Sequence, residues 1–269
     1  MIFGIREQRF KQVAKWFTRD EFLKFTSYDD IPSKNMREQI ASLVEHDPIY
    51  HPSAFGHAKY QFPGLESIKE NYSQSWQDMF VLTMHRGLRT GTYLELGASE
   101  PVYMNNTWLL EQFGWHGISI DFRDELESQW ETMRPGARYI HDNALKLDFD
   151  QLLMSMPSQI DYLQVDLDET ASLSALQRLP HHRYRFSVIT FETDVFAGHQ
   201  HVQQQAQEFL QSMGYQLVIK NVAVKNYTTN TWEPFEDWYI DPGVIDPSIA
   251  ELFLDISNSK KLPHEIFIK

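Results

Sequence analysis

Acidic side chains recur where the apolar segments of this sequence end. Glu95, Asp121 and Asp166 each lie at or next to the end of an apolar run that is typical of a buried strand. Carboxylates gathered at one edge of a sheet repel one another, so a cation, a proton or a hydroxyl-rich ligand must compensate them. Any single one of them could instead be a helix N-cap, which Asp often is. The further carboxylates at strand ends are Asp142, Asp168, Glu192 and Asp194.

The acidic residues at the ends of the first three expected strands, Glu95, Asp121 and Asp142, favour contacts to a nucleotide. A carboxylate at the end of the second strand accepts hydrogen bonds from two ribose hydroxyls in a Rossmann-like site, and Asp121 has that position. Glu95 lies beside the turn at Gly97. Asp142 is expected near an adenine amino group or a nearby polar edge.

The second acidic group comes from two later strands in the middle of the expected sheet. Asp166, Asp168 and Glu192 would offer hard oxygen ligands. Such ligands suit Mg²⁺, Mn²⁺ or Ca²⁺ better than zinc. The sequence therefore predicts a divalent cation as a second ligand of this edge.

Strands and helices alternate from Gly91 onward, and this alternation must position the acidic residues. It is typical of a doubly wound, mostly parallel sheet that binds ligands at the carboxyl ends of its strands. The expected helices cover 75–86, 106–113, 172–179 and 202–213. The expected strands are 92–96, 117–121, 138–141, 160–166, 187–192, 215–220 and 238–240.

The composition narrows the class of protein. The chain has 269 residues, is 42% hydrophobic and carries a net charge of −13. The acidic balance argues against a broad nucleic-acid surface. The absence of cysteine excludes disulfides and zinc–thiolate sites. No apolar run approaches the ~18 residues of a membrane span and none is typical of a signal peptide, so we expect a cytoplasmic protein.

Two domains are expected. Residues 1–80 are predicted to form a helical and loop extension that caps the site, selects the acceptor or mediates homo-oligomerisation. Residues 81–269 are predicted to form the α/β domain that carries the acidic edge.

Five sequence blocks carry a family resemblance. They are YSQSWQD from Tyr72, YLELGASEPVYMNNTWLLEQFGWHGISID from Tyr93, IDYLQVDLDETASLSAL from Ile160, VITFE from Val188, and GYQLV with EDWYIDP. In this order and spacing the chain, from about Tyr72 to Val244, resembles the FkbM-like branch of S-adenosylmethionine-dependent methyltransferases.

The resemblance implies a fold and an activity. The expected fold is a Rossmann-like, class I methyltransferase sheet of seven strands with a reversed hairpin at its C-terminal edge. The expected reaction is methyl transfer from S-adenosylmethionine to a hydroxyl of a sugar, glycan or glycosylated metabolite, assisted by Mg²⁺ or another divalent cation. A bound cation and a nearby base would raise the nucleophilicity of such a hydroxyl.

The resemblance also implies roles for individual residues. Asp166, Asp168 and Glu192 would hold the cation, and Asp168 or His199 would act as the general base. The residues expected to contact the cofactor are Gln74, Asp78, Glu95, Gly97, Asn105, Asn106, Asp121, Asp142 and Asp166.

Several positions depart from the family pattern. Pro101 stands where the family has a second glycine, and Glu100 stands where it has Asp. A proline cannot adopt a positive φ, so its ring is expected to lie where the methionine part of the cofactor passes. Asp168 and Glu169 replace the Glu and Gly of the family.

Two other kinds of function stay open. A catalytically inactive relative would use the acidic edge as a binding module. A nicotinamide-dependent oxidoreductase would need G-x-G-x-x-G after the first expected strand, where this sequence has only Gly97.

The aromatic residues near the C-terminus either stack on a sugar ring or pack in the core. They are Trp232, Phe235, Trp238 and Tyr239.

Overall fold

The structure is a computed structural model, and it describes residues 58–268 apart from 168–170, 194 and 227–230. Predictions that fall on residues 1–57, and those for Asp168, Glu169 and Asp194, lie outside the described residues. Within the described part of the chain, no helix is long and apolar enough to cross a membrane.

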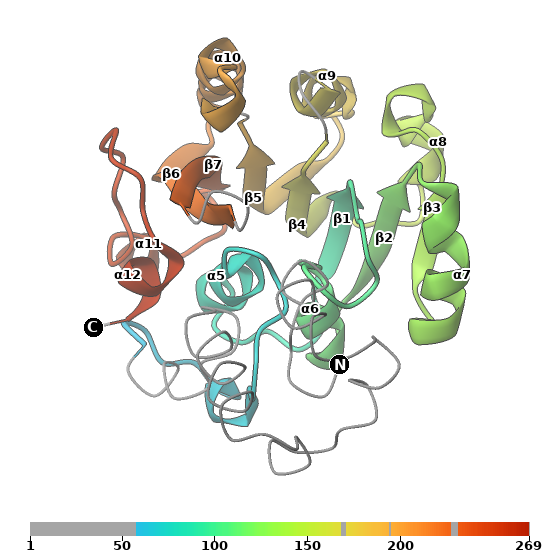
Figure 1. Ribbon diagram of the computed structural model, residues 1–269, viewed down its shortest axis with the longest axis horizontal. Helices are drawn as coiled ribbons and strands as arrows, with labels where there is room; N and C mark the ends of the chain where they lie inside the picture. Colours follow the sequence, from blue (N-terminus) through green and yellow to red (C-terminus); the bar gives the residue numbers. More distant parts are fainter. Residues whose placement is uncertain (1–57, 168–170, 194, 227–230, 269) are drawn as a thin grey trace, which may run out of the picture.

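A seven-stranded sheet forms the centre of the molecule (Figure 1). Its strand order is β3-β2-β1-β4-β5-β7-β6. The first five strands run parallel, and β7 pairs antiparallel with both β5 and β6. This confirms the predicted Rossmann-like sheet with its reversed hairpin at the C-terminal edge. The strands are β1 (Thr92–Leu96), β2 (His116–Asp121), β3 (Arg138–His141), β4 (Gln159–Val165), β5 (Arg185–Glu192), β6 (Gln216–Asn226) and β7 (Thr231–Ile240).

Helices cover both faces of the sheet (Figure 1). On one face lie α8 (Phe149–Leu152), α9 (Ala171–Arg178) and α10 (Gln200–Ser212). On the other lie α5 (Gln77–Met84) and α6 (Trp108–Gln112), with α11 (Pro247–Ala250) and α12 (Pro263–Phe267) beside β6 and β7. The remaining long helix, α7 (Asp124–Met133), lies beside β3. Single-turn helices occupy Leu65–Ser67, Ala144–Lys146 and Val195–Ala197.

The two faces of the sheet differ in polarity near the strand ends. Leu96, Ile120, Val165 and Phe191 belong to the apolar core beneath α8, α9 and α10. The neighbouring row faces the other way because successive side chains alternate across a strand. That row is polar and runs in register through Ser119, Glu95, Gln164 and Thr190.

The sequence analysis placed most elements within a few residues, and two differences have physical causes. The helix predicted from Asn106 begins at Trp108, with Thr107 at its N-cap position. The Asn105 side chain accepts hydrogen bonds from the backbone N–H groups of Thr107 and Trp108, which fixes residues 105–107 ahead of the helix. The last hairpin is longer than predicted. Its strands shift register at three places and contain Pro234, which obscures the alternation of apolar and polar residues.

The described part of the predicted N-terminal extension packs onto the α/β domain. Leu65, Trp76 and Met79 share a core cluster with Tyr162 of β4 and Trp238 of β7. The backbone N–H of Lys59 donates to the carbonyl of Phe267 at 2.7 Å. The predicted division after residue 80 falls within α5.

Candidate functional site

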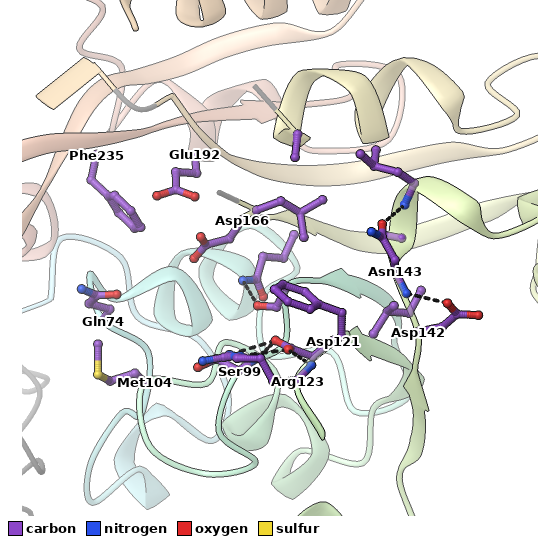
Figure 2. A pocket seen from close by; sticks show the side chains of 18 residues that line it. Gln74, Ser99, Met104, Asp121, Arg123, Asp142, Asn143, Asp166, Glu192 and Phe235 are labelled. Carbon is purple, nitrogen blue, oxygen red and sulfur yellow. Dashed lines mark hydrogen bonds and ion pairs between the residues drawn. The ribbon is translucent and has the colours of Figure 1, made fainter. Parts of the chain in front are cut away.

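A cavity of about 380 Å³ lies at the carboxyl ends of the parallel strands. Figure 2 shows two groups of side chains around it. Asp121, Arg123, Asp142 and Asn143 lie toward one end, which we call the nucleotide end. Gln74, Asp166, Glu192 and Phe235 lie toward the other, which we call the acceptor end. Six predicted site residues therefore line one cavity: Gln74, Gly97, Asp121, Asp142, Asp166 and Glu192.

The turn after β1 requires a glycine. Gly97 has a φ of 82°, and a Cβ atom there would lie 1.7 Å from the carbonyl oxygen of Asp166. The backbone N–H groups of Gly97 and Ala98 both donate to the carbonyl of Ile120 at 2.9 Å. The turn is thus held against β2 and β4 at once, and only glycine leaves room for that approach.

Pro101 lies outside the lining of the cavity. Among the described residues that line the cavity, the loop contributes Ser99 and Met104, and Pro101 is buried away from it. Ser99 and Met104 adopt the positive φ values, 54° and 56°. The left-handed turns of this loop therefore fall on residues other than Pro101, and the expectation that its ring meets the methionine part of the cofactor stays a prediction.

Asp121 makes four hydrogen bonds within the protein. Its Oδ2 accepts from the Ser99 backbone N–H at 2.8 Å and from Arg123 Nη2 at 2.9 Å. Its Oδ1 accepts from the Arg123 backbone N–H at 3.1 Å and from Arg123 Nε at 3.0 Å. Burial alone would raise the pKa of Asp121, but these hydrogen bonds and the Arg123 charge hold it below its usual range. Asp121 is therefore a fixed carboxylate that faces the cavity.

The loop after β3 contributes the rest of the nucleotide end. The Asp142 backbone N–H donates to the carbonyl of Asp121 at 3.0 Å, which continues the pairing beyond the strands. Asp142 Oδ1 accepts from the Asn143 backbone N–H at 2.6 Å. Asn143 Oδ1 accepts from the Leu145 backbone N–H at 2.8 Å. Asn143 was not predicted as a site residue, although a polar residue directly after Asp142 could have suggested it.

Three buried oxygen atoms near the turn lack a donor. Glu95 Oε1, Gln164 Oε1 and Asn106 Oδ1 have no hydrogen-bond partner in the described part of the chain. Glu95 and Gln164 are neighbours in register on β1 and β4, and Gln164 lines the cavity. The other oxygen of Glu95 accepts from Ser119 at 2.6 Å and from Thr107, which follows Asn106, at 2.9 Å. Burial raises the pKa of Glu95 to about 7, against the opposing charge of Arg134.

Arg134 holds the loop from behind. Its side chain is completely buried and forms an ion pair with Glu111 at 2.5 Å. It also donates to the Pro101 carbonyl at 3.1 Å and to Asn105 Oδ1 at 3.0 Å. Asn105 in turn donates to the carbonyl of Ala98 at 3.0 Å. Asn105 therefore acts through the loop and does not line the cavity.

A further buried carboxylate lies behind the acceptor end. Glu236 on β7 is the register partner of Glu192 and is completely buried. It accepts hydrogen bonds from Gln77 Nε2 at 3.0 Å and from Trp238 Nε1 at 2.6 Å. Burial, together with the charge of nearby Asp166, raises its pKa to about 8. Glu236 was not predicted as a site residue, because β7 also contains Glu233 and Asp237, and their spacing does not single out Glu236.

The aromatic residues near the C-terminus divide between the two roles. Trp238 and Tyr239 are completely buried in the core and cannot stack on a ligand. Phe235 lines the cavity, and its ring centroid lies 6.3 Å from that of the exposed Phe196. Trp232 is partly exposed on β7, with Lys225 Nζ 5.6 Å from its ring centroid.

Two other predicted site residues lie away from the cavity. Asp78 is completely buried and accepts from the backbone N–H groups of Tyr72 and Ser73 at 2.8 and 3.2 Å. It thereby fixes the segment that presents Gln74. His199 caps α10, where its ring lies 5.8 Å from that of His201.

The predicted metal set is only partly described. Asp166 and Glu192 line the cavity, and the third predicted ligand, Asp168, lies outside the described residues. Over the described ranges, no group of three or more His, Asp or Glu residues is arranged to hold a metal ion. The described donor set therefore does not by itself make a metal site.

Comparisons with known proteins give matches among solved structures only. No family model and no curated protein matches the chain. A TehB-like S-adenosylmethionine-dependent methyltransferase from Corynebacterium glutamicum is 14% identical, with 66% of this chain and 92% of that chain covered and a TM-score of 0.40. An rRNA methylase from Streptococcus thermophilus is 12% identical, with 61% and 94% covered and a TM-score of 0.38.

A third structure was solved with ligands. It is the 1,6-didemethyltoxoflavin-N1-methyltransferase of Burkholderia thailandensis with 1,6-didemethyltoxoflavin and S-adenosylhomocysteine bound. It is 16% identical, with 61% of this chain and 76% of that chain covered and a TM-score of 0.39. Similarity this low assigns neither an activity nor an acceptor to this chain.

Proposed function

We propose that this chain is an S-adenosylmethionine-dependent methyltransferase. The observation that carries the proposal is that a fixed carboxylate and a set of buried oxygens without donors among the described residues lie at one sheet edge. Asp121 faces the cavity, and its carboxylate would accept from the ribose hydroxyls. Gln164, which lines the cavity, and the buried Glu95 and Asn106, which do not, would accept from an ammonium group, which carries three N–H donors.

The donor set fits this cofactor better than a nicotinamide dinucleotide. Glu95 and Gln164 favour a cation, whereas a pyrophosphate next to the same turn would meet a buried carboxyl. Asp142 at the nucleotide end would accept from the adenine amino group. When bound, the cofactor supplies an electrophilic methyl group on a sulfonium, and the residues of this chain orient it and the acceptor.

We further propose that the acceptor is a hydroxyl of a sugar, a glycan or a glycosylated metabolite. Asp166 and Glu192 line the acceptor end, where carboxylates can hydrogen-bond hydroxyls and take up the proton that leaves. Phe235 offers a flat apolar surface at the same end. Asp168 remains a predicted general base. A cation held by Asp166, Asp168 and Glu192 also remains a prediction, and the proposed binding of the acceptor and uptake of its proton do not depend on it.

The test is methyl transfer from S-adenosylmethionine with a labelled methyl group to a panel of mono- and disaccharides. The proposal predicts S-adenosylhomocysteine and a labelled, base-stable sugar ether, formed by wild type and by Asp150→Asn, a change on the exposed surface of α8. Asp166→Asn should lose at least about a hundredfold in rate. Cofactor binding without transfer to any acceptor would favour the binding-module alternative.

A further inference from the structure

Every acceptor position of the Asp121 carboxylate is already used within the protein. A carboxylate has about four lone-pair sites, two on each oxygen. Oδ2 accepts from the Ser99 backbone N–H and Arg123 Nη2, and Oδ1 accepts from the Arg123 backbone N–H and Arg123 Nε. Figure 2 shows the side chain of Arg123 and the Ser99 segment converging on Asp121.

Two of these four hydrogen bonds cannot be released easily. The Ser99 N–H belongs to the loop that Arg134 holds through Pro101 and Asn105. The Arg123 N–H belongs to the backbone that leads from β2 into α7. The other two come from one side chain, and the two hydroxyls of a ribose need two acceptor sites. The side chain of Arg123 therefore occupies as many sites as a ribose requires.

The Arg123 side chain is also the more exposed partner of this ion pair. It is 38% exposed, whereas Asp121 is 4% exposed, so the arginine can leave without opening the core. Glu125, on the first turn of α7, is a second carboxylate whose charge acts on Arg123. A displaced guanidinium would thus keep a nearby counter-charge.

We infer that Arg123 is an internal competitor for the cofactor ribose, and that its two side-chain hydrogen bonds to Asp121 must break before the ribose hydroxyls bind. The inference rests on the proposed function. Arg123 keeps the buried carboxylate satisfied in the free protein and lowers the affinity for the cofactor. Removing its side chain should leave Asp121 with acceptors ready for the ribose.

The experiment measures the affinity of S-adenosylhomocysteine for wild type, Arg123→Gln and Arg138→Gln by calorimetry. Arg138, on neighbouring β3, bonds Ser155 and Leu152 and does not line the cavity, so its variant removes the same charge without touching Asp121. Arg123→Gln should bind about three- to tenfold more tightly. Arg138→Gln should bind like wild type.

A second ligand pair tests the ribose itself. Arg123→Gln should strengthen the binding of adenosine but not of 2′,3′-dideoxyadenosine, which lacks both hydroxyls. If Arg123→Gln bound S-adenosylhomocysteine no more tightly than wild type does, the inference about Arg123 would be overturned. Binding by the wild type would still support the proposed function in that case. If no variant bound S-adenosylhomocysteine, the proposed function would fail and the inference with it.

Discussion

Glu95 and Gln164 lie side by side in register on β1 and β4, and each has a buried oxygen without a donor in the described part of the chain. Two unsatisfied acceptors on adjacent strands cost free energy in the free protein. A bound ammonium group would satisfy both. This pair therefore links the polar row of the sheet to the cationic part of the proposed cofactor.

Binding of S-adenosylhomocysteine should depend on the protonation of Glu95. Its pKa in the free protein is raised to about 7, so below that pH the carboxyl is protonated and must lose its proton to hold an ammonium. Affinity should therefore rise as the pH rises from 5.5 to about 7 and then level off. Calorimetry across this range checks the slope.

Two controls isolate Glu95 in that experiment. Glu95→Gln should remove most of the pH dependence, and adenosine, which lacks the amino-acid part, should show none that arises from this group. An S-adenosylhomocysteine affinity that is constant from pH 5.5 to 7.5 would contradict the assignment.

Gly97→Ala should destabilise the protein strongly. The new Cβ would lie 1.7 Å from the carbonyl oxygen of Asp166, and alanine would have to adopt a φ of 82°. We expect a loss of at least about 3 kcal/mol in the free energy of unfolding, measured with urea. Gly136→Ala is the matched control, because a Cβ there meets no described atom within 4 Å. Equal stability of the two variants would refute this account of the turn.

Arg134→Met should disrupt the loop that lines the cavity. It removes a completely buried guanidinium that pairs with Glu111 and donates hydrogen bonds to Asn105 and to the Pro101 carbonyl. Breaking such a buried pair costs about 3–5 kcal/mol. Affinity for S-adenosylhomocysteine should fall too, measured at a temperature where the variant is still folded.

A matched arginine separates this effect from loss of charge. Arg183→Met removes an exposed arginine whose ion pair with Asp150 spans 3.9 Å, and it should cost less than about 1 kcal/mol. The role given to Arg134 would not survive if both variants had the same stability and the same affinity.

Protein stability should fall as the pH rises because of Glu236. Its pKa is raised from 4.5 to about 8 in the folded chain. As the pH rises, Glu236 therefore loses its proton in the unfolded chain before it does so in the folded chain. Its contribution to the free energy of unfolding is fully present below pH 4.5 and is lost progressively up to about pH 8. Glu236→Gln should flatten the decline in melting temperature between pH 5 and 8. Glu251→Gln, at an exposed position, is the control and should show the same decline as wild type. If Glu236→Gln also showed the wild-type decline, the role given to Glu236 would be wrong.

The predicted residues that line the cavity include those that end apolar runs. Asp121 and Glu192 end buried strands and Asp166 follows one, and parallel strands bring their carboxyl ends to one edge. Gln164 was not predicted, because it lies before the end of β4 and is one of three polar residues of that strand, with Gln159 and Asp161. Its partner Glu95 was identified from its place before Gly97.

Other parts of the site depend on contacts that sequence spacing does not encode. Arg134 contacts Pro101 and Asn105 from the C-terminal end of α7. From the sequence, an arginine at the end of a helix is expected to be exposed to solvent. Arg123 binds Asp121 only because the chain turns sharply after β2. The sequence also did not indicate that Ser99 and Met104, and not Pro101, would line the cavity and adopt the positive φ values of this loop.

The most direct test of the central claim is the affinity of S-adenosylhomocysteine for wild type, Asp121→Asn and Asp150→Asn, measured by calorimetry at pH 7.5. Asp121 lines the cavity and Asp150 is exposed on α8. The account predicts micromolar binding by wild type and Asp150→Asn, and a loss of at least about tenfold for Asp121→Asn. No binding by folded wild type at millimolar ligand, or equal binding by all three proteins, would contradict it.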